Sequence, residues 1–314
     1  MKFLRARLVA PAMTVGLMLG SATAQTPERP AITGVSHLAV YAADPDASER
    51  FYVETLGATR RADPTDPDGV RYYFSPKQFV EVLPLPAEAG EKNRLAHAAF
   101  ATEDAEALRA YLEANDVKVP DGVEKASDGS AWFEVEDPEG TPVRFVEAPE
   151  TLPDVRDNPI SSRVMHVGFI VHDRARQDAF YKDVLGFRDY WSGGPEGERE
   201  VWVSLQVPDG TDWVEYMIVG EPDGHGIPED MSKDTLGVLN HFALGVPNTR
   251  DTYTVLWNEE RLAGQDEVPK IGLDAKWQLN LYDPDGTRAE FMEFAPIGEP
   301  CCNPFKGAHP SADE

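Results

Sequence analysis

One strand-like run, with a histidine as its fourth residue, occurs four times along this chain. The copies are GVSHLAVYA at 34–42, RLAHAAFAT at 94–102, RVMHVGFIV at 163–171 and VLNHFALGV at 238–246. Recurrence of one run is typical of a chain built from copies of a single module. Any fold of this sequence must therefore place four equivalent strands.

The residues of each copy alternate between two faces, which indicates a β-strand. One face is bulky and apolar, as with Phe242 and Leu244. The other face carries the histidine and, two residues later, a small residue, which is Ala39, Ala99, Gly168 or Ala243 in the four copies. We expect the bulky face to pack against helices and the histidine face to look into a space that the small residues keep open.

Helical segments are expected after each strand, and they group the copies into pairs. FYVETLG and FYKDVLG begin 14 residues after the first and third histidines, whereas the segments after the second and fourth lack this signature. Further strands follow, separated by turns such as DPEG and DPDG. The pattern predicts an α+β fold of four modules, with modules 1 and 2 forming one duplicate and modules 3 and 4 the other.

The duplicates are flanked by segments of other composition. Basic MKFLRAR, a short apolar run and an A-x-A site ending at Ala24 are typical of a secretory signal peptide. We therefore expect an exported protein, periplasmic or extracellular. The expected bounds are 1–24 for the signal peptide, 25–31 for a linker, 32–148 for domain 1, 149–162 for a Pro-, Asp- and Ser-rich linker, 163–297 for domain 2 and 298–314 for a C-terminal tail.

The charge of the chain limits its partners. The formal net charge is −26, and removal of Lys2, Arg5 and Arg7 with the signal peptide makes it −29. Such a charge disfavours nucleic acid and anionic membranes as partners. No later segment approaches the roughly 18 consecutive apolar residues of a membrane-spanning helix. We expect a small-molecule partner, and the sequence does not specify an oligomeric state.

Cys301 and Cys302 are the two cysteines of the chain, and they are adjacent. Such a pair could close a small ring, bind a soft metal or have no visible role. Because ordinary disulfide geometry does not suit adjacent residues, we favour the last.

Carboxylates recur at a matching place in the last strand of three modules. Glu81, Glu215 and Glu290 follow their histidines by 44, 49 and 49 residues. The second module has Arg144 there instead, and its Glu147 falls three places later. Glu215 is one residue farther from its turn than Glu290 is, which leaves its register open.

Histidine nitrogens and carboxylate oxygens are ligands that divalent first-row metals accept. Modules 3 and 4 offer His166, Glu215, His241 and Glu290, which would leave an octahedral ion two adjacent positions for a substrate with two neighbouring oxygens. We predict a divalent ion there (Fe²⁺, Mn²⁺, Zn²⁺ or Ni²⁺) and no organic cofactor. Inheritance of these residues by duplication, without use, is the rival explanation.

Modules 1 and 2 offer His37, Glu81 and His97, formally a triad of two histidines and one carboxylate. Arg144 would place a fixed positive charge where the fourth ligand belongs, so we expect this second site to be degenerate. The other histidines are weaker candidates, with His172 at a strand end, His225 in a loop and His309 in the tail.

These features resemble the vicinal oxygen chelate superfamily, which includes glyoxalase I, extradiol dioxygenases, methylmalonyl-CoA epimerase and bleomycin-resistance proteins. The first-strand histidine, the FYVETLG and FYKDVLG helices, the DPDG turn and the last-strand glutamate carry the likeness, which covers residues 32 to 297. It implies βαβββ modules in two pairs, each a cup-shaped mixed β-sheet with outer helices. It also implies His166, Glu215, His241 and Glu290 as ligands of one metal.

The resemblance leaves the reaction open. Four modules resemble the extradiol dioxygenases, whose C-terminal pair binds iron through a triad that matches His166, His241 and Glu290. Those enzymes carry a further acid/base histidine where this chain has DWVEYMIVG. The set of two histidines and two glutamates is more similar to glyoxalase I or the epimerase, although export disfavours glutathione and CoA substrates.

We therefore expect a metal-dependent isomerase or lyase that acts on a small substrate, with Glu215 or Glu290 moving a proton. One alternative is a ring-cleaving dioxygenase that uses Fe²⁺. The other is a non-catalytic protein that binds a small molecule or confers resistance to it.

Overall fold

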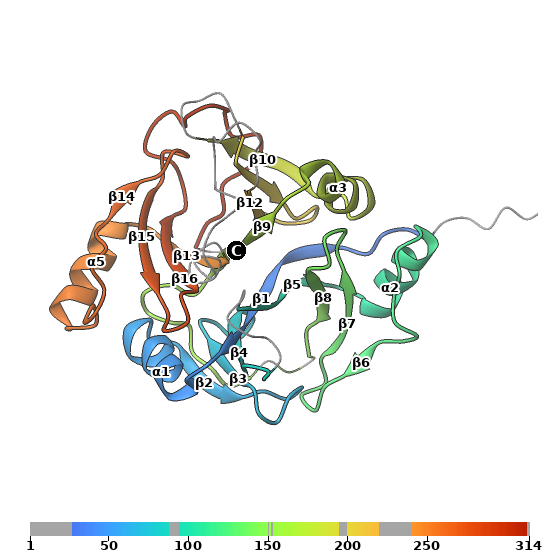
Figure 1. Cartoon of the computed structure of the whole chain (residues 1–314), viewed down its shortest axis with the longest axis horizontal. Helices are drawn as coiled ribbons and strands as arrows, with labels where there is room; N and C mark the ends of the chain where they lie inside the picture. The colour runs from blue at the N-terminus through green and yellow to red at the C-terminus, as the bar shows by residue number, and fades with distance from the viewer. Residues whose placement is uncertain are drawn as a thin grey trace, which may run out of the picture.

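The computed structural model describes residues 27–87, 94–149, 151, 153–194, 200–219 and 240–312. These form two eight-stranded mixed sheets (Figure 1). The first sheet contains β1 (Ile32–Ala42), β2 (Thr59–Ala62), β3 (Val70–Tyr73), β4 (Phe79–Pro84), β5 (Leu95–Thr102), β6 (Glu124–Lys125), β7 (Ala131–Glu136) and β8 (Pro142–Glu147). The second contains β9 (Val164–Val171), β10 (Arg188–Gly193), β11 (Trp202–Gln206), β12 (Trp213–Ile218), β13 (His241–Val246), β14 (Lys270–Ile271), β15 (Trp277–Tyr282) and β16 (Arg288–Glu293).

Modules 1 and 2 make up the first sheet, and modules 3 and 4 the second. Their strand orders are equivalent, β2-β3-β4-β1-β5-β8-β7-β6 and β10-β11-β12-β9-β13-β16-β15-β14. At the centre of each sheet two first strands pair antiparallel, β1 with β5 and β9 with β13. The last strand of each module runs parallel to its own first strand. The α+β fold of four modules in two pairs is thus confirmed.

The strand register settles the alignment that the sequence left open for Glu215. In every module the residue two places beyond the histidine faces the same position of the last strand. The facing pairs are Ala39 with Glu81, Ala99 with Arg144, Gly168 with Glu215, and Ala243 with Glu290. The extra residue after the third module's turn therefore lies before β12 and does not shift the glutamate.

One helical segment follows the first strand of each module. The helices are α1 (Pro45–Glu49) with its π-helical extension η1 (Arg50–Thr55), α2 (Ala105–Ala114), α3 (Arg174–Asp178) with η2 (Ala179–Val184), and α5 (Thr249–Asn258). Each begins after an Asp or Asn whose side chain accepts a backbone N–H of the first turn. Glu147 and Glu293 accept further N–H groups at the starts of α2 and α5. Glu147 is therefore a helix cap in a position shared with Glu293.

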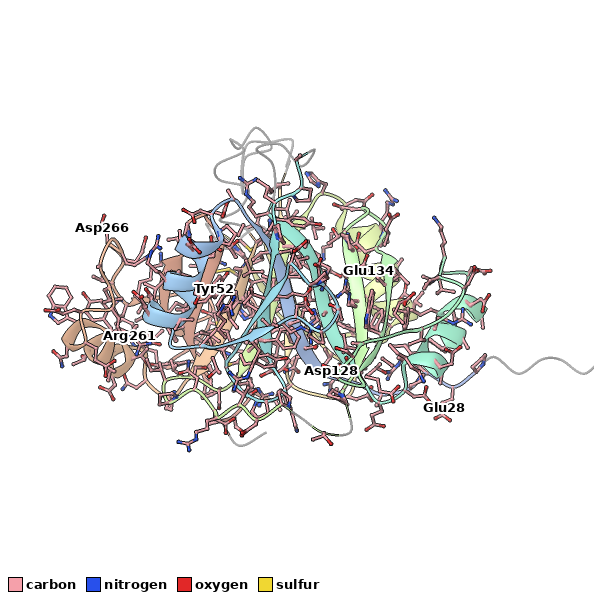
Figure 2. All side chains as sticks on the ribbon, turned by 90° about the horizontal axis from the view of Figure 1, so that it is seen from below. Glu28, Tyr52, Asp128, Glu134, Arg261 and Asp266 are labelled. Atoms are coloured by element: carbon pink, nitrogen blue, oxygen red, sulfur yellow. A yellow bond between two sulfur atoms is a disulfide. The ribbon has the colours of Figure 1, made fainter. Side chains whose placement is uncertain are left out.

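One hydrophobic core cluster contains residues of both halves. The bulky faces of the first strands enter it from both sheets, as expected, through residues such as Phe100 and Phe242. Tyr52 of η1 approaches Phe242 with ring centroids 6.4 Å apart, and Phe187 after η2 meets Phe100 at 5.2 Å. Each odd-numbered module thus packs its helix against the opposite sheet, as Figure 2 shows around Tyr52. The histidine faces point away from this shared core.

The C-terminal tail packs along β10 of the second sheet. The backbone N–H of Lys306 donates to the Tyr190 carbonyl at 2.8 Å, and the Phe305 ring lies 4.8 Å from that of Tyr190. Cys301 and Cys302 are joined by a disulfide, with Cys302 in the left-handed region at φ 83°. The expectation that these cysteines have no visible role is therefore wrong, because the pair closes a small ring within the packed tail.

Some of the expectations concern location and bounds. The signal peptide predicted at 1–24 lies outside the described residues. Of the helices that are described, none has the length and apolar character needed to cross a membrane. The domain bounds at 32–148 and 163–297 stay predictions.

Candidate metal centre

The concave face of the second sheet brings the predicted ligands together, from β9, β12, β13 and β16. His166, His241 and Glu290 each offer one ligand atom, and these atoms all lie within 4.8 Å of one another. His166 Nε2 is 3.6 Å from Glu290 Oε2. His241 Nε2 is 3.1 Å from Glu215 Oε2, within hydrogen-bond distance. His166, His241 and Glu290 therefore form one buried group, whereas Glu215 of β12 lies beside this group against His241 and is not a member of it.

Two polar groups in this place lack partners. His166 is fully buried, and neither of its ring nitrogens makes a hydrogen bond. Asn280, which faces Glu290 from β15, has a buried Oδ1 that is also unpaired. Leaving such an atom unpaired costs about 1–3 kcal/mol, so buried polar atoms normally have partners. An imidazole without a partner beside two carboxylates fits a divalent cation.

The two glutamates of the set differ in pKa. Burial, together with the neighbouring Glu215 and Asp274, raises the pKa of Glu290 to about 7. Burial also acts to raise the pKa of Glu215, but the hydrogen bond with His241 and the proximity of His166 outweigh it and lower this pKa to about 2. Burial lowers the pKa of His166 well below 6.5. The imidazole of His166 is thus neutral, which is the form that binds metals.

The small residues beside the histidines have a different role from the one expected. In the antiparallel pair of β9 and β13, Gly168 faces His241 and Ala243 faces His166. A Cβ on Gly168 would lie 2.0 Å from Cε1 of His241. The space at Gly168 is therefore filled by the imidazole of the facing strand, and the expectation that it lies open for a substrate is wrong.

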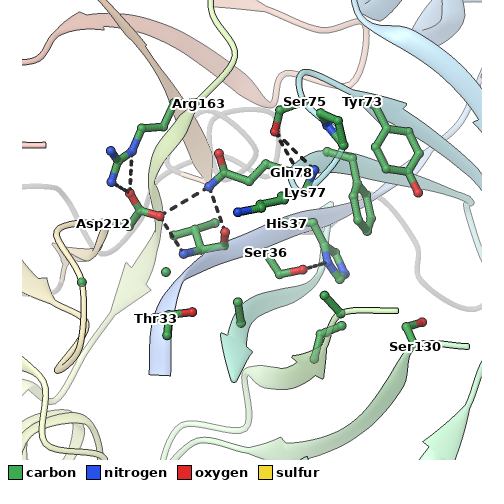
Figure 3. A pocket seen from close by; sticks show the side chains of 18 of the residues that line it. Thr33, Ser36, His37, Tyr73, Ser75, Lys77, Gln78, Ser130, Arg163 and Asp212 are labelled. Carbon is green, nitrogen blue, oxygen red and sulfur yellow. Dashed lines mark hydrogen bonds and ion pairs between the residues drawn. The ribbon is translucent and has the colours of Figure 1, made fainter. Parts of the chain in front are cut away.

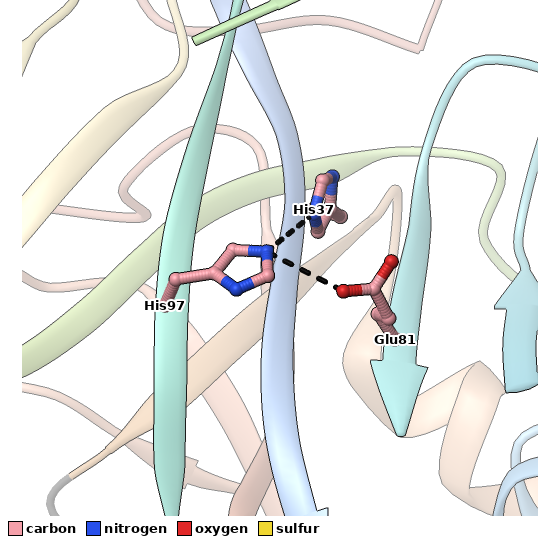
Figure 4. Close-up of side chains that lie close together, drawn as sticks. All are labelled: His37, Glu81 and His97. Atoms are coloured by element: carbon pink, nitrogen blue, oxygen red, sulfur yellow. Dashed lines mark hydrogen bonds and ion pairs between the residues drawn. The ribbon is translucent and has the colours of Figure 1, made fainter. Parts of the chain in front are cut away.

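The first sheet carries an equivalent set, His37 on β1, Glu81 on β4 and His97 on β5 (Figure 4). The two imidazoles stand edge to face with centroids 5.0 Å apart, as they do in the second sheet. Here, however, the nitrogens have partners. His37 Nε2 is 2.8 Å from His97 Nε2, and His37 Nδ1 is 3.0 Å from Ser36 Oγ. A metal would have to break this histidine pair.

Two guanidinium groups beside Glu81 also distinguish the first-sheet set from the second-sheet set. Arg71 Nε lies 3.2 Å from Glu81 Oε1, and Arg144 Nη1 lies 3.6 Å from Glu81 Oε2. The equivalent positions of the second sheet hold Ser204, which faces Glu215, and Glu290. A cation bound at Glu81 would face two fixed positive charges. The side chains present thus fit a divalent ion at the second-sheet set and do not fit one at the first.

Some residues around the second-sheet set were not predicted. Trp213 faces His166 across the parallel pair, and their ring centroids are 4.6 Å apart. Phe79 faces His37 at the equivalent position, with ring centroids 4.4 Å apart, so the repeat contained a signal for Trp213. Lys276 is buried with its Nζ 4.8 Å from the Trp213 ring, and it has no counterpart that a repeat could have disclosed.

The weaker histidine candidates do not join the set. His172 is exposed, and its Nδ1 lies 3.1 Å from Glu139 Oε2. His309 of the tail places Nδ1 2.7 Å from the Tyr190 hydroxyl oxygen. His225 lies outside the part of the chain that the structure describes.

One protein-family model matches both halves of the chain. The model of the Glyoxalase/Bleomycin resistance protein/Dioxygenase superfamily matches residues 34–145 and 163–291. No curated protein matches the chain.

Similar solved structures include ring-cleaving enzymes and a glyoxalase. The 2,3-dioxygenase LapB from Pseudomonas sp. KL28 is 15% identical, over 91% of this chain and 96% of that one, with a TM-score of 0.61. Homoprotocatechuate 2,3-dioxygenase from Arthrobacter globiformis is 17% identical, over 86% and 82%, with a TM-score of 0.62. A Mn(II)-bound glyoxalase from Novosphingobium aromaticivorans is 18% identical, over 84% and 83%, with a TM-score of 0.60. At these identities the likeness shows a shared fold.

Proposed function

Because this chain belongs to the Glyoxalase/Bleomycin resistance protein/Dioxygenase superfamily, we propose that it is a metal-dependent enzyme with its active site on the concave face of the second sheet. The proposed chemistry is an isomerase or lyase reaction on a small substrate that presents two neighbouring oxygens. The observation that carries the proposal is the buried His166, which has no hydrogen-bond partner and stands 3.6 Å from Glu290.

In this proposal His166, Glu215, His241 and Glu290 hold the ion. A bound divalent cation would act as a Lewis acid that stabilises negative charge on a substrate oxygen. Neutral imidazoles and two ionised carboxylates would balance its charge, which suits burial in an apolar surrounding.

The two glutamates take different roles. Glu290, whose pKa is raised to about 7 in the metal-free protein, would accept a proton from a carbon next to the substrate oxygens and return it. Glu215 has a pKa lowered to about 2 and accepts hydrogen bonds from Ser204 at 3.3 Å and His241 at 3.1 Å. We therefore assign proton transfer to Glu290 and a purely ligating role to Glu215.

Apolar side chains exclude water from one side of this site. Trp213, Ala243 and Met292 belong to one buried cluster, and Phe305 of the tail packs against it. Exclusion of water strengthens the electrostatic interactions of the buried carboxylates. The tail is thus part of the proposed active-site wall.

A ring-cleaving dioxygenase is the second candidate. Two of the similar solved structures are 2,3-dioxygenases, and His166, His241 and Glu290 form a triad of two histidines and one carboxylate. The segment DWVEYMIVG, however, has no histidine to serve as a second-sphere acid or base. Because this histidine is lacking, we favour the isomerase or lyase reaction over the dioxygenase reaction.

We propose export of the protein from the signal-peptide pattern at 1–24. N-terminal sequencing of protein from the exported fraction should begin at Gln25. Recovery of an intact N-terminus from the cytoplasm would contradict this part of the proposal.

The reaction is tested with metal-loaded protein and a panel of α-hydroxyketones in ²H₂O, followed by NMR. We expect loss of the C–H signal beside the carbonyl. Glu290→Gln should stop the exchange, whereas Glu81→Gln, the matched change in the first sheet, should leave it intact. Oxygen uptake with catechols and no proton exchange would instead establish the dioxygenase. Metal-loaded protein that does neither would refute the proposal.

A further inference from the structure

A cavity of about 950 Å³ opens on the concave face of the first sheet, away from the candidate metal centre. His37, Phe79 and Arg144 line it from β1, β4 and β8, and its far end reaches Arg163 and Asp212 (Figure 3). Volumes of several hundred Å³ are typical of small-molecule sites. The proposed function makes no use of this cavity.

Polar groups at the far end of the cavity already have partners. Arg163 Nη2 lies 2.7 Å from Asp212 Oδ1. Gln78 Nε2 donates to the carbonyls of Val35 and Val164 at 2.9 Å each, and its Oε1 accepts the N–H of Val164 at 2.9 Å. These bonds hold β1 beside β9 and serve the fold. The polar group of a ligand would therefore bind at the opposite end of the cavity, called the near end, which His37, Phe79 and Arg144 line.

Two cationic side chains at the near end can still donate hydrogen bonds to a ligand. Arg144 has 12% of its side chain exposed and makes one hydrogen bond in the described part of the chain, from Nη2 to Glu134 Oε2 at 3.2 Å. Its buried Nε has no partner, although a guanidinium carries five donors. Lys77 is exposed at the cavity wall, and no described carboxylate pairs with it.

The carboxylates near these cations leave room for an anion. Glu134 has 38% of its side chain exposed, so it can turn toward solvent when another anion approaches Arg144. Asp128, which also lines the cavity, faces Arg71 at 3.7 Å. Arg144 Nη1 also lies 3.6 Å from the buried Glu81 Oε2, so the guanidinium has two carboxylate partners, and its Nε is the donor that a ligand can still satisfy.

Flat side chains lie on two sides of the near end. The Phe79 ring stacks on His37 with centroids 4.4 Å apart, and Tyr73 lies 4.8 Å from Phe79. Opposite them on the sheet, the guanidinium carbon of Arg144 lies 3.9 Å from the centre of the Trp132 ring. Aromatic surfaces beside a guanidinium suit a flat ligand that carries a negative group.

We propose that this cavity is a metal-independent binding site for an aromatic carboxylate. The carboxylate pairs with Arg144 and Lys77, and the ring lies against the aromatic side chains. Arg144 occupies the position that Glu290 has in the second sheet. One half of the duplicated chain thus holds an anion where the other half holds a cation, and the inference does not depend on the proposed function.

The test is calorimetric titration of the mature, EDTA-treated protein with 2-naphthoate. We expect one site per chain and the same affinity in His241→Ala, since that residue lies in the other sheet. Arg144→Met keeps the stem over Trp132 but removes the charge, and it should weaken binding by about tenfold or more. Arg250→Met removes a comparable arginine, 5.1 Å from the Trp277 ring and outside the cavity, and should change nothing.

A neutral ligand of the same shape, naphthalene-2-methanol, should bind about tenfold more weakly than 2-naphthoate. If Arg144→Met does not fold, Lys77→Met at an exposed position gives the same test, with a several-fold loss expected. Absence of 2-naphthoate binding, equal affinity for the alcohol, unchanged affinity in the cavity variants, or loss of binding in His241→Ala would overturn the inference. Failure of the second sheet to bind metal would leave it standing.

Discussion

Gly168 stands where the other three copies of the first strand carry alanine. In the first sheet Ala39 faces His97 across the antiparallel pair, so a methyl group is accommodated there. At Gly168 a Cβ would come within 2.0 Å of the His241 ring. His241 therefore packs directly on the backbone of β9, and the orientation of its imidazole depends on the missing side chain.

Gly168→Ala should push the His241 ring out of the ligand set. Crowding of this kind costs about 1–3 kcal/mol of unfolding free energy, and the affinity for metal should fall with it. Urea unfolding and chelator competition measure the two effects. Gly298→Ala, where an added Cβ meets nothing within 4 Å, is the control and should change neither. Metal affinity equal to wild type in Gly168→Ala would contradict the placement of His241.

The residues that the repeat marks were the predictable ones. The histidines could be found because each copy of the first strand presents one at the same place, and the glutamates because three of the four last strands do. Arg71 and Ser204 could not, because the third strands of the modules share no motif that would align them. These two residues nevertheless decide which glutamate is paired with a positive charge. Arg71 forms an ion pair with Glu81, whereas Ser204 only donates a hydrogen bond to Glu215.

At the scale of elements, the tyrosine of each FYVETLG or FYKDVLG motif contacts the opposite half. Tyr52 of η1 donates to Asp283 Oδ2 in the DPDG turn of module 4 at 3.0 Å. Tyr181 of η2 approaches Asp137 Oδ2 in the DPEG turn of module 2 at 3.5 Å. The helical segments of the even-numbered modules lack this signature.

Tyr52→Phe should destabilise the protein by about 1–2 kcal/mol, because it leaves the buried Asp283 one hydrogen bond short. Tyr181→Phe removes a longer bond, and Asp137 keeps the bond from Gln177 at 2.9 Å, so its cost should be smaller. Urea unfolding of both variants at pH 8 gives the comparison. The reverse order of stabilities would show that these hydroxyls do not tie the halves as described.

Elements with a periodic pattern were predictable, and elements without one were not. The first strands and the helices after them were expected from alternation and from the repeated signature. The tail has neither, because its place is set by contacts with Tyr190 that depend on tertiary structure. The disulfide of Cys301 and Cys302 was one of three possibilities and was not favoured, since the rule that disfavours adjacent cysteines describes ordinary disulfides.

At the scale of the whole molecule, duplicated halves share one core while their histidine faces point outward. The two sets have the same ring arrangement, with imidazole centroids 5.0 Å apart in each. They differ in the charge around it, with two arginines beside Glu81 in the first half and a second glutamate in the other. The two halves thus share one ring geometry and differ in the charge beside it.

Metal binding should depend on pH through Glu290, whose pKa burial raises to about 7. The ion must displace this proton, so apparent affinity should rise by up to about tenfold per pH unit below pH 7 and level off above it. Chelator competition between about pH 5.5 and 8 measures this. Affinity that stays constant over this range would argue against Glu290 as a ligand.

The metal-free protein should respond to pH in the opposite sense. A folded-state pKa above the unfolded value means that the Glu290 proton stabilises the fold at low pH. This contribution to the unfolding free energy should be lost as pH rises from about 4.5 through about 7, by up to about 1.4 kcal/mol per unit. Urea unfolding with and without EDTA, in wild type and Glu290→Gln, isolates the contribution.

If the second-sheet set binds the metal and the first-sheet set does not, loss of one histidine should affect metal content in the second sheet alone. The most direct test is metal content per chain after reconstitution with Fe²⁺, Mn²⁺, Zn²⁺ or Ni²⁺ and desalting, in wild type, His241→Ala and His97→Ala. The last two change equivalent residues of the two sheets. We predict one equivalent in wild type and His97→Ala and none in His241→Ala. A full equivalent retained by His241→Ala and lost by His97→Ala would contradict this expectation.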